Sequence, residues 1–175
     1  LLGSIVANRT SSIADLSIIT QEEQKELVEI FNDTQSEEVT SSTLVDLFRD
    51  QVARTPDSTA LVYQDKMFTY QELDEISNQL ANYLRSNHTI AIEDFIGVKL
   101  DRSDDLMISL LAVMKSGGVY VPIDPNHPQD RISYIEQDSN CKVIIDSETL
   151  KTFKEVKENY PVILPNIPLS EDHLA

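Results

Sequence analysis

The sequence is poor in glycine and cysteine and has no tryptophan. Its 175 residues include four glycines and one cysteine. With Cys141 alone, no disulfide can form within the chain, which favours a reducing compartment and predicts a cytoplasmic protein. The glycines are too few and too scattered to form a glycine-rich phosphate loop. They are Gly3, Gly97, Gly117 and Gly118.

Residues that could bind a metal or act as a nucleophile do not cluster. His88, His127 and His173 are isolated in the sequence, and no group of His and Cys residues has the spacing of a metal site. Cys141 lies beside a predicted strand, where a buried and unreactive thiol is expected. The sequence therefore predicts no metal site and no catalytic nucleophile.

Positive charge is scarce. Lys and Arg total 14 and Asp and Glu total 30, so the formal net charge is −16. Such a field repels a phosphate backbone, which argues against a nucleic acid partner. No apolar run approaches the ~18 residues of a membrane span, and no basic amphipathic stretch suggests a membrane surface. Residues 1–4 show no basic region before an apolar one, so no signal peptide is expected.

A polar and acidic segment, residues 32–42, divides the chain. Before it, Thr20 is a good N-cap with Glu23 three positions later, and a short helix with an apolar stripe should follow. The stripe consists of Leu27, Ile30 and Phe31. The composition of residues 32–42 is that of a linker. We therefore expect a leader at residues 1–42 and a domain at residues 43–175.

After residue 43 the patterns of helices and strands alternate. The expected helices begin after Thr43, Thr69, Ser103 and near Pro128, and a last one covers residues 150–158. The first two expected strands form a small hairpin, and the later ones alternate with helices. This order predicts an α/β fold with a mostly parallel sheet layered with helices. The expected strands are residues 60–63, 67–68, 95–100, 119–123, 142–146 and 162–164.

Two of the expected helices have clear local signals. Thr69 is an N-cap with Glu72 at N3, and Phe68 and Leu73 are placed to form a hydrophobic staple. The helix after Ser103 is apolar on nearly every side, which predicts that it is buried. Lys115 lies near its carboxyl end, where the helix dipole favours a cation. Gly117 or Gly118 can then adopt the left-handed conformation that ends a helix.

Two carboxylates follow the ends of expected strands. Asp101 and Asp124 occupy positions where α/β proteins often place functional groups. No partner lysine or metal-binding group accompanies either residue in the sequence. They are therefore candidate functional residues without an assigned chemistry.

Several segments resemble the adenylation domains of nonribosomal peptide synthetases. Residues 68–73 (FTYQEL) resemble the first core motif of that family, and residues 110–125 (LLAVMKSGGVYVPIDP) resemble the second. Residues 127–132 (HPQDRI) match the proline-acidic-arginine stretch that follows. The pair 45–48 and 54–57 matches the usual opening segment. The resemblance covers residues 43–175 and implies an incomplete N-terminal lobe of an adenylation domain.

The leader adds to this resemblance. Residues 16–35 resemble the linker that joins a condensation domain to its adenylation domain, which favours a peptide synthetase over a stand-alone acyl-CoA ligase. The sequence departs from the family at Ser116, where Ala is usual. It also departs at residues 87–89 (Asn-His-Thr), which replace a glycine turn.

The resemblance implies a ligase that uses ATP and magnesium to activate an amino acid and loads it on the phosphopantetheine thiol of a carrier protein. The implied partners are the rest of the adenylation domain, an upstream condensation domain and a downstream carrier domain, and an MbtH-like helper is a further candidate. The resemblance implies that the family's phosphate loop, specificity residues and catalytic lysine would follow after Ala175. This chain by itself is therefore expected to be inactive, with no catalytic, cofactor-binding or metal-binding residue.

The motif residues of this chain are expected to have a structural role. They are Thr69, Tyr70, Glu72, Leu73, Lys115, Gly117, Gly118, Tyr120, Pro122, Asp124 and Arg131. Two alternatives stay open. One is a non-catalytic interaction lobe that contacts a condensation domain or an MbtH-like helper. The other is a part of a stand-alone acyl-CoA ligase.

The division of the chain predicts where a protease cuts first. Residues 32–42 have almost no apolar side chain to bury, so the first cuts in limited proteolysis should fall there. Mass spectrometry of the fragments identifies the positions of the first cuts. First cuts between Leu106 and Met114 would contradict the placement of that helix in the core.

Overall fold

The computed structural model describes residues 18–34, 43–170 and 172–173, and the single residues 3, 6, 10 and 12. The chain forms two compact units, Leu1–Val39 and Thr40–Ala175. Most of the predicted linker, from residue 35 to residue 42, lies outside the described residues. The boundary predicted at residue 42 therefore stays a prediction.

The first unit contains the helix predicted after Thr20. It comprises α2 (Gln21–Lys25) and a π-helical turn, η2 (Glu26–Ile30), that continues it. The hydroxyl of Thr20 accepts the N–H of Glu23 at 3.1 Å, and the Glu23 carboxylate accepts the N–H of Thr20 at 2.7 Å. This capping box confirms the predicted start. The apolar stripe that follows, Leu27, Ile30 and Phe31, is between 49% and 63% exposed.

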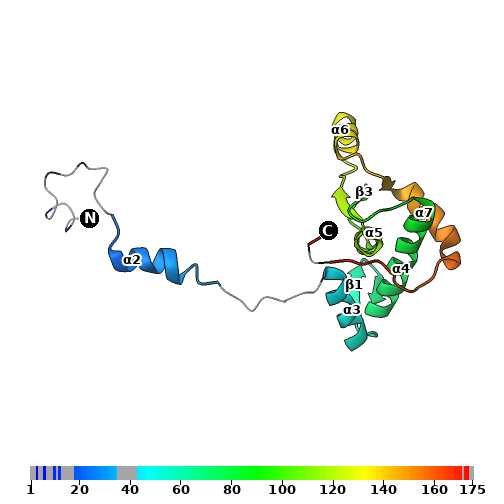
Figure 1. The fold of residues 1–175 in the computed structure, drawn as a ribbon, viewed down its shortest axis with the longest axis horizontal. Helices are drawn as coiled ribbons and strands as arrows, with labels where there is room; N and C mark the ends of the chain where they lie inside the picture. Colours follow the sequence, from blue (N-terminus) through cyan, green and yellow to red (C-terminus); the bar gives the residue numbers. More distant parts are fainter. Residues whose placement is uncertain are drawn as a thin grey trace. The chain divides into compact units, whose positions relative to one another are not determined.

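In the second unit, helices and strands alternate after a hairpin, as predicted (Figure 1). The helix α3 comes first, the hairpin of β1 and β2 follows, and the three remaining strands are separated by helices. The elements are α3 (Leu44–Arg54), β1 (Thr59–Tyr63), β2 (Lys66–Thr69), α4 (Tyr70–Asn87), β3 (Phe95–Val98), α5 (Asp104–Ser116), β4 (Val119–Pro122), α6 (Gln129–Ser139), β5 (Val143–Ile145), α7 (Ser147–Val156) and the 3-10 turn η3 (Lys157–Asn159).

The strands form two sheets. β1 and β2 pair antiparallel, and β4, β3 and β5 form a parallel sheet with β3 in the middle. Phe95 lies opposite Val119 in β4, and Ile96 lies opposite both Tyr120 and Val143. Within β3, residues 96–98 are buried, with Ile96 0% exposed, whereas Phe95 at the start of the strand is 40% exposed. The predicted α/β class is confirmed.

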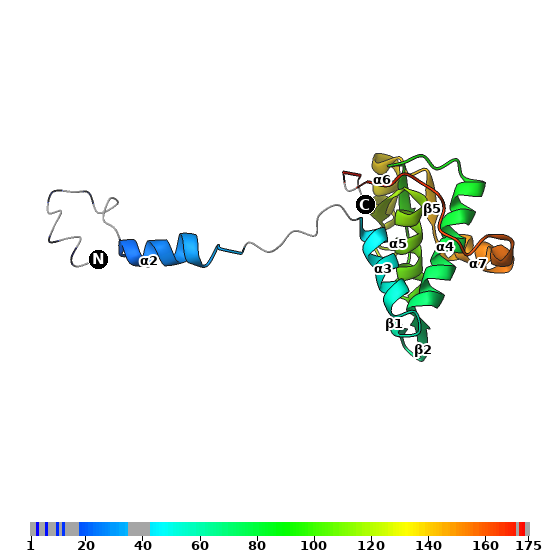
Figure 2. The same ribbon diagram turned by 60° about the horizontal axis from the view of Figure 1, so that its bottom comes forward.

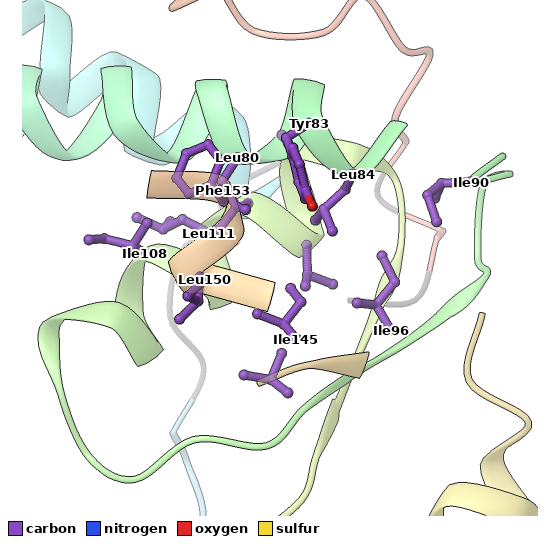
Figure 3. Close-up of a cluster of buried hydrophobic side chains, with 14 of the residues drawn as sticks. Leu80, Tyr83, Leu84, Ile90, Ile96, Ile108, Leu111, Ile145, Leu150 and Phe153 are labelled. Carbon is purple, nitrogen blue, oxygen red and sulfur yellow. The ribbon is translucent and has the colours of Figure 1, made fainter. Parts of the chain in front are cut away.

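The core lies between this sheet and the helices. α5 contacts β3, β4 and α4, while α7 contacts β5. The helices α3, α4 and α5 lie side by side in Figure 2. Figure 3 shows Leu80 and Leu84 of α4 in one cluster with Ile145 of β5 and Phe153 of α7, and all four are 1% exposed or less. Burying an aliphatic or aromatic side chain of this size contributes about 1.5–3 kcal/mol to stability.

The turn from α5 to β4 depends on two glycines. Gly117 has a φ of 82°, in the left-handed region that favours glycine. Its N–H donates to the Met114 carbonyl and that of Gly118 to the Val113 carbonyl, each at 3.1 Å, which is a Schellman end. A Cβ on Gly118 would lie 2.5 Å from Cδ1 of Ile96. Both glycines are therefore needed for α5 to turn back against β3.

The loop that follows α4, residues 88–94, contains no glycine. α4 ends at Asn87, and His88 has an extended backbone with a φ of −133°. The guanidinium of Arg85 donates to the carbonyl of Ile90 at 3.2 Å and to that of Ser116 at 2.8 Å. Arg85 thereby ties the loop to the end of α5.

The strand predicted at residues 162–164 is wrong. Five carbonyls of this segment, those of residues 157 and 160–163, are instead held by three side-chain amides of α4, those of Asn78, Gln79 and Asn82. Asn78 donates to the carbonyl of residue 162 at 2.8 Å, and Asn82 donates to those of residues 161 and 163 at 2.9 Å each. Gln79 donates to those of residues 157 and 160. These carbonyls are satisfied without a neighbouring strand.

The structure predicts the effect of removing the cap of α4. The Thr69 hydroxyl accepts the Glu72 N–H at 3.1 Å, and the Glu72 carboxylate accepts the Thr69 N–H at 2.8 Å. Thr69→Ala should lower the free energy of unfolding by about 0.5–2 kcal/mol, and Thr69→Ser by much less, since it keeps the hydroxyl. Urea unfolding of the chain measures this. A Thr69→Ala variant with an unchanged free energy of unfolding would contradict this role of the cap.

Candidate functional site

A buried ammonium group joins the two helices that carry the sequence motifs. Lys115 is in the last turn of α5, and its side chain is 0% exposed. Its Nζ donates to Oδ1 of Asp74 at 2.7 Å, to the main-chain carbonyl of Asp74 at 3.2 Å and to the Ser77 hydroxyl at 2.7 Å. These three bonds use all three N–H groups of the ammonium. We call Lys115, Asp74, Ser77 and Phe48 the Lys115 centre.

The fourth member of the centre comes from α3. The ring centroid of Phe48 lies 5.0 Å from Nζ of Lys115, within the range of a cation–π contact. The same ring packs against Tyr70, with centroids 6.0 Å apart. Side chains from α3, α4 and α5 therefore meet around one positive charge.

Electrostatics at the centre are dominated by desolvation. Burial lowers the pKa of Lys115, the hydrogen bond and charge of Asp74 raise it, and burial prevails. The second carboxylate oxygen of Asp74 accepts from Nδ2 of Asn78 at 2.9 Å. The Ser77 hydroxyl donates to the Leu73 carbonyl at 2.6 Å, so its oxygen is free to accept from Lys115. The ammonium is thus enclosed by groups that are themselves held in place.

The centre brings the two resembled motifs together. Thr69, Tyr70, Glu72 and Leu73 form the cap and first turn of α4, and Asp74 follows them directly. Lys115 belongs to the second motif, in which Gly117 and Gly118 make the turn into β4. The sequence placed Lys115 at a helix end but gave it no partner. The sequence analysis did not identify Phe48, Asp74 and Ser77 as partners of Lys115. Asp74 and Ser77, a polar pair three residues apart beside the buried Leu73, were a signal that could have indicated them.

The other motif residues lie elsewhere. Tyr120, Pro122 and Asp124 line a pocket of about 520 Å³ at the carboxyl ends of β3 and β4, together with Asp101. Arg131 is exposed on α6. None of these side chains takes part in the Lys115 centre.

The two candidate carboxylates at the strand ends are bridged by one amide. Nδ2 of Asn126 donates to Asp101 at 2.7 Å and to Asp124 at 3.2 Å. The N–H of Asn126 also donates to Asp124, and this bond lowers the pKa of Asp124. The structure therefore does bring Asp101 and Asp124 together, in a hydrogen-bonded cluster closed by Asn126.

The described part of the chain holds neither a metal cluster nor a membrane span. There, no group of three or more His, Cys, Asp and Glu side chains could hold a metal ion. Among residues 18–34, 43–170 and 172–173, no helix has both the length and the apolar character needed to cross a membrane.

The family model for AMP-binding enzymes matches residues 48–172, and the chain belongs to this family. Within it, the chain is the N-terminal part of an adenylation domain of the nonribosomal peptide synthetase type, as the relatives show. Tyrocidine synthase 2 of Brevibacillus parabrevis is 40% identical over 148 residues, which are 85% of this chain and 4% of that protein.

Two further similarities cover all or most of the chain. A linear gramicidin synthase of the same organism is 35% identical over 187 aligned positions, which cover 100% of this chain and 2% of that protein. The solved N-terminal subdomain of NpsA from Klebsiella oxytoca, in complex with 3-hydroxybenzoyl-AMSN, has a TM-score of 0.68 and 28% identity. That match covers 80% of this chain and 38% of the NpsA chain. The chain thus spans a few per cent of the curated relatives.

The Lys115 centre predicts an unequal effect of removing its two charges. Asp74→Ala leaves an ammonium unpaired at 0% exposure, so the free energy of unfolding should fall by about 3–5 kcal/mol. Lys115→Met should lower it by clearly less, because the remaining Asp74 carboxylate is 21% exposed and can be hydrated. Urea unfolding of the 175-residue chain measures both.

The double variant is the control for this prediction. Asp74→Ala combined with Lys115→Met should be more stable than Asp74→Ala alone, because no buried charge remains unpaired. If the double variant loses as much free energy of unfolding as the two single variants together, Asp74 and Lys115 do not interact. The Lys115 centre would then not be what joins α4 to α5.

Proposed function

We propose that this chain is part of a nonribosomal peptide synthetase whose adenylation domain activates an amino acid with ATP. The aminoacyl group of the adenylate would then pass to the phosphopantetheine thiol of a carrier domain. One observation carries this proposal: the AMP-binding family matches residues 48–172, and a peptide synthase is 40% identical over 85% of the chain. ATP and magnesium would act in the whole domain.

The part of the domain that this chain represents would have a structural role, and other segments would carry the catalytic groups. The sequence holds no glycine-rich phosphate loop, and its motif residues cap helices, form turns and fill the core. The Lys115 centre supports this role, because the Lys115 ammonium is bound by the Asp74 carboxylate and the Ser77 hydroxyl. We therefore propose that this segment alone holds no cofactor and that its motif residues act structurally.

The leader supports a place inside a multidomain synthetase. The linear gramicidin synthase aligns with the whole chain, including residues 1–42. The exposed stripe of Leu27, Ile30 and Phe31 offers an apolar face for an upstream condensation domain. We propose this domain, a downstream carrier domain and an MbtH-like helper as partners. The single cysteine fits a cytoplasmic enzyme.

Two alternatives can be separated from this proposal. The exposed stripe on the first unit favours a non-catalytic interaction lobe as a second function of this segment. A stand-alone acyl-CoA ligase is disfavoured by the leader, which aligns with a peptide synthetase.

The proposal predicts the outcome of an exchange assay. The whole synthetase should catalyse amino-acid-dependent exchange of pyrophosphate into ATP, and the 175-residue chain should not. The assay measures labelled ATP with each amino acid in turn, against a blank without protein. Exchange driven by a fatty acid and by no amino acid would identify an acyl-CoA ligase. Robust exchange by the chain alone would contradict the structural role of this segment.

A further inference from the structure

The helix α3 is attached to the rest of the second unit by few apolar side chains. Val45 is its one buried residue, and it is not a member of the main cluster of buried apolar side chains. Phe48 packs against that cluster and is half-buried. On the outer face of the helix, Leu44 is 61% exposed and Leu47 is 41% exposed. The core is therefore built from α4, α5, α7 and the parallel sheet, and α3 adds little to it.

Polar bonds do not anchor α3 to the neighbouring helices. Among the residues that the structure describes, no side chain of α3 forms a hydrogen bond or a salt bridge with another helix or with a strand. The side chains of Asp46 and Gln51 bond instead to Thr43 and Thr55, which are the caps of the same helix. In contrast, the Lys115 centre joins α4 directly to α5.

One aromatic ring provides the specific contact of α3. The ring of Phe48 lies over Nζ of Lys115, 5.0 Å from the ring centroid, and packs against Tyr70. A charge on the same helix opposes this contact. Burial lowers the pKa of Lys115 most, and the positive charge of Arg49 lowers it further, so the two cations repel each other. α3 therefore carries both the ring that covers Lys115 and a like charge that repels it.

The segment that follows α3 is fixed independently of the helix. The N–H of Tyr70 donates to the Ser58 carbonyl and that of Gln71 to the Pro56 carbonyl, each at 3.0 Å. These two bonds hold the segment against the start of α4. Thr55, between α3 and this segment, has a φ of −141° and a ψ of 60°, so the helix ends there. α3 can therefore leave α4 and α5 by a change at Thr55, while the following segment stays in place.

We propose that α3 is a releasable latch of the second unit. It undocks as one piece, Phe48 leaves the Lys115 ammonium, and the ion pair of Lys115 with Asp74 keeps α4 and α5 together. An isolated helix of 11 residues is marginal in water, so the released segment loses its helical hydrogen bonds. Because α3 is the first helix of the second unit, its release adds up to about 36 Å of extended chain to the connection between the two units. The latch therefore sets the length of that connection.

Hydrogen–deuterium exchange of the full chain tests the latch. The backbone amides of residues 48–54 in α3 should exchange at least about 100-fold faster than those of residues 108–116 in α5, because α3 opens locally while the core stays closed. Equal protection of the two segments would overturn the proposal, since α3 would then open only when the whole unit unfolds. Exchange involves neither ATP nor an amino acid, so a failure here leaves the adenylation proposal untouched.

A mild core substitution separates local release from global unfolding. Ile145→Val shortens a side chain that is 0% exposed in β5, the strand against which α7 packs. It should speed the exchange of residues 108–116 by about two- to tenfold, because these amides exchange through unfolding of the core. It should leave the exchange of residues 48–54 unchanged, because release of α3 does not open the core. Equal acceleration of both segments would overturn the proposal.

A matched pair of alanine variants tests the contact that holds the latch. Phe48→Ala removes the ring over Lys115 and should speed the exchange of residues 48–54 by at least about tenfold. Leu44→Ala changes an exposed side chain of the same helix and should leave that exchange unchanged. Alanine is a strong helix former, so faster exchange of the Phe48 variant would not come from a weaker helix. Equal effects of the two substitutions would overturn the assignment of Phe48. If Phe48→Ala does not fold, the Ile145→Val comparison still decides the proposal.

Discussion

The positive charge of Lys115 lies where three helices meet, and its burial constrains everything around it. An ammonium with 0% exposure must be compensated by nearby acceptors, because the loss of its hydration is worth several kcal/mol. Asp74 and Ser77 supply these acceptors from α4, and the ring of Phe48 covers the charge from α3. The distances of 2.7 Å leave little freedom in how α4 and α5 pack. The position of α4 against α5 follows from this contact and from the apolar core that the two helices share.

This arrangement explains why two separate stretches of sequence behave as one structural unit. The first resembled motif starts α4 and places Asp74 in its second turn. The second motif runs through the end of α5, the Gly117–Gly118 turn and β4 without interruption. Lys115 then links the two motifs through a single ion pair. The two motifs therefore contribute helix ends, a turn and a strand to the framework of the second unit.

The boundaries of the elements were largely predictable from the sequence, because they depend on residues that are close together in the chain. Each capping box joins residues three positions apart, as in Thr69 and Glu72, so a local pattern is enough to place the helix start. The left-handed turn at Gly117 and the hairpin of β1 and β2 are equally local. The alternation of helices and strands then indicated the α/β class, and the quoted motifs indicated the family.

The tertiary structure alone decided which groups meet. Lys115 and Asp74 are 41 positions apart, and Asn78 binds a carbonyl 84 positions away. The apolar pattern predicts that α5 is buried, but it does not show which neighbour neutralises a charge in that helix. The same limit explains the strand wrongly predicted at residues 162–164. Its β-branched residues fit a strand locally, whereas the distant amides of α4 hold its carbonyls in another conformation. Local sequence determined where helices begin and end in this protein, and long-range burial and hydrogen bonding determined the Lys115 centre and the conformation of residues 160–163.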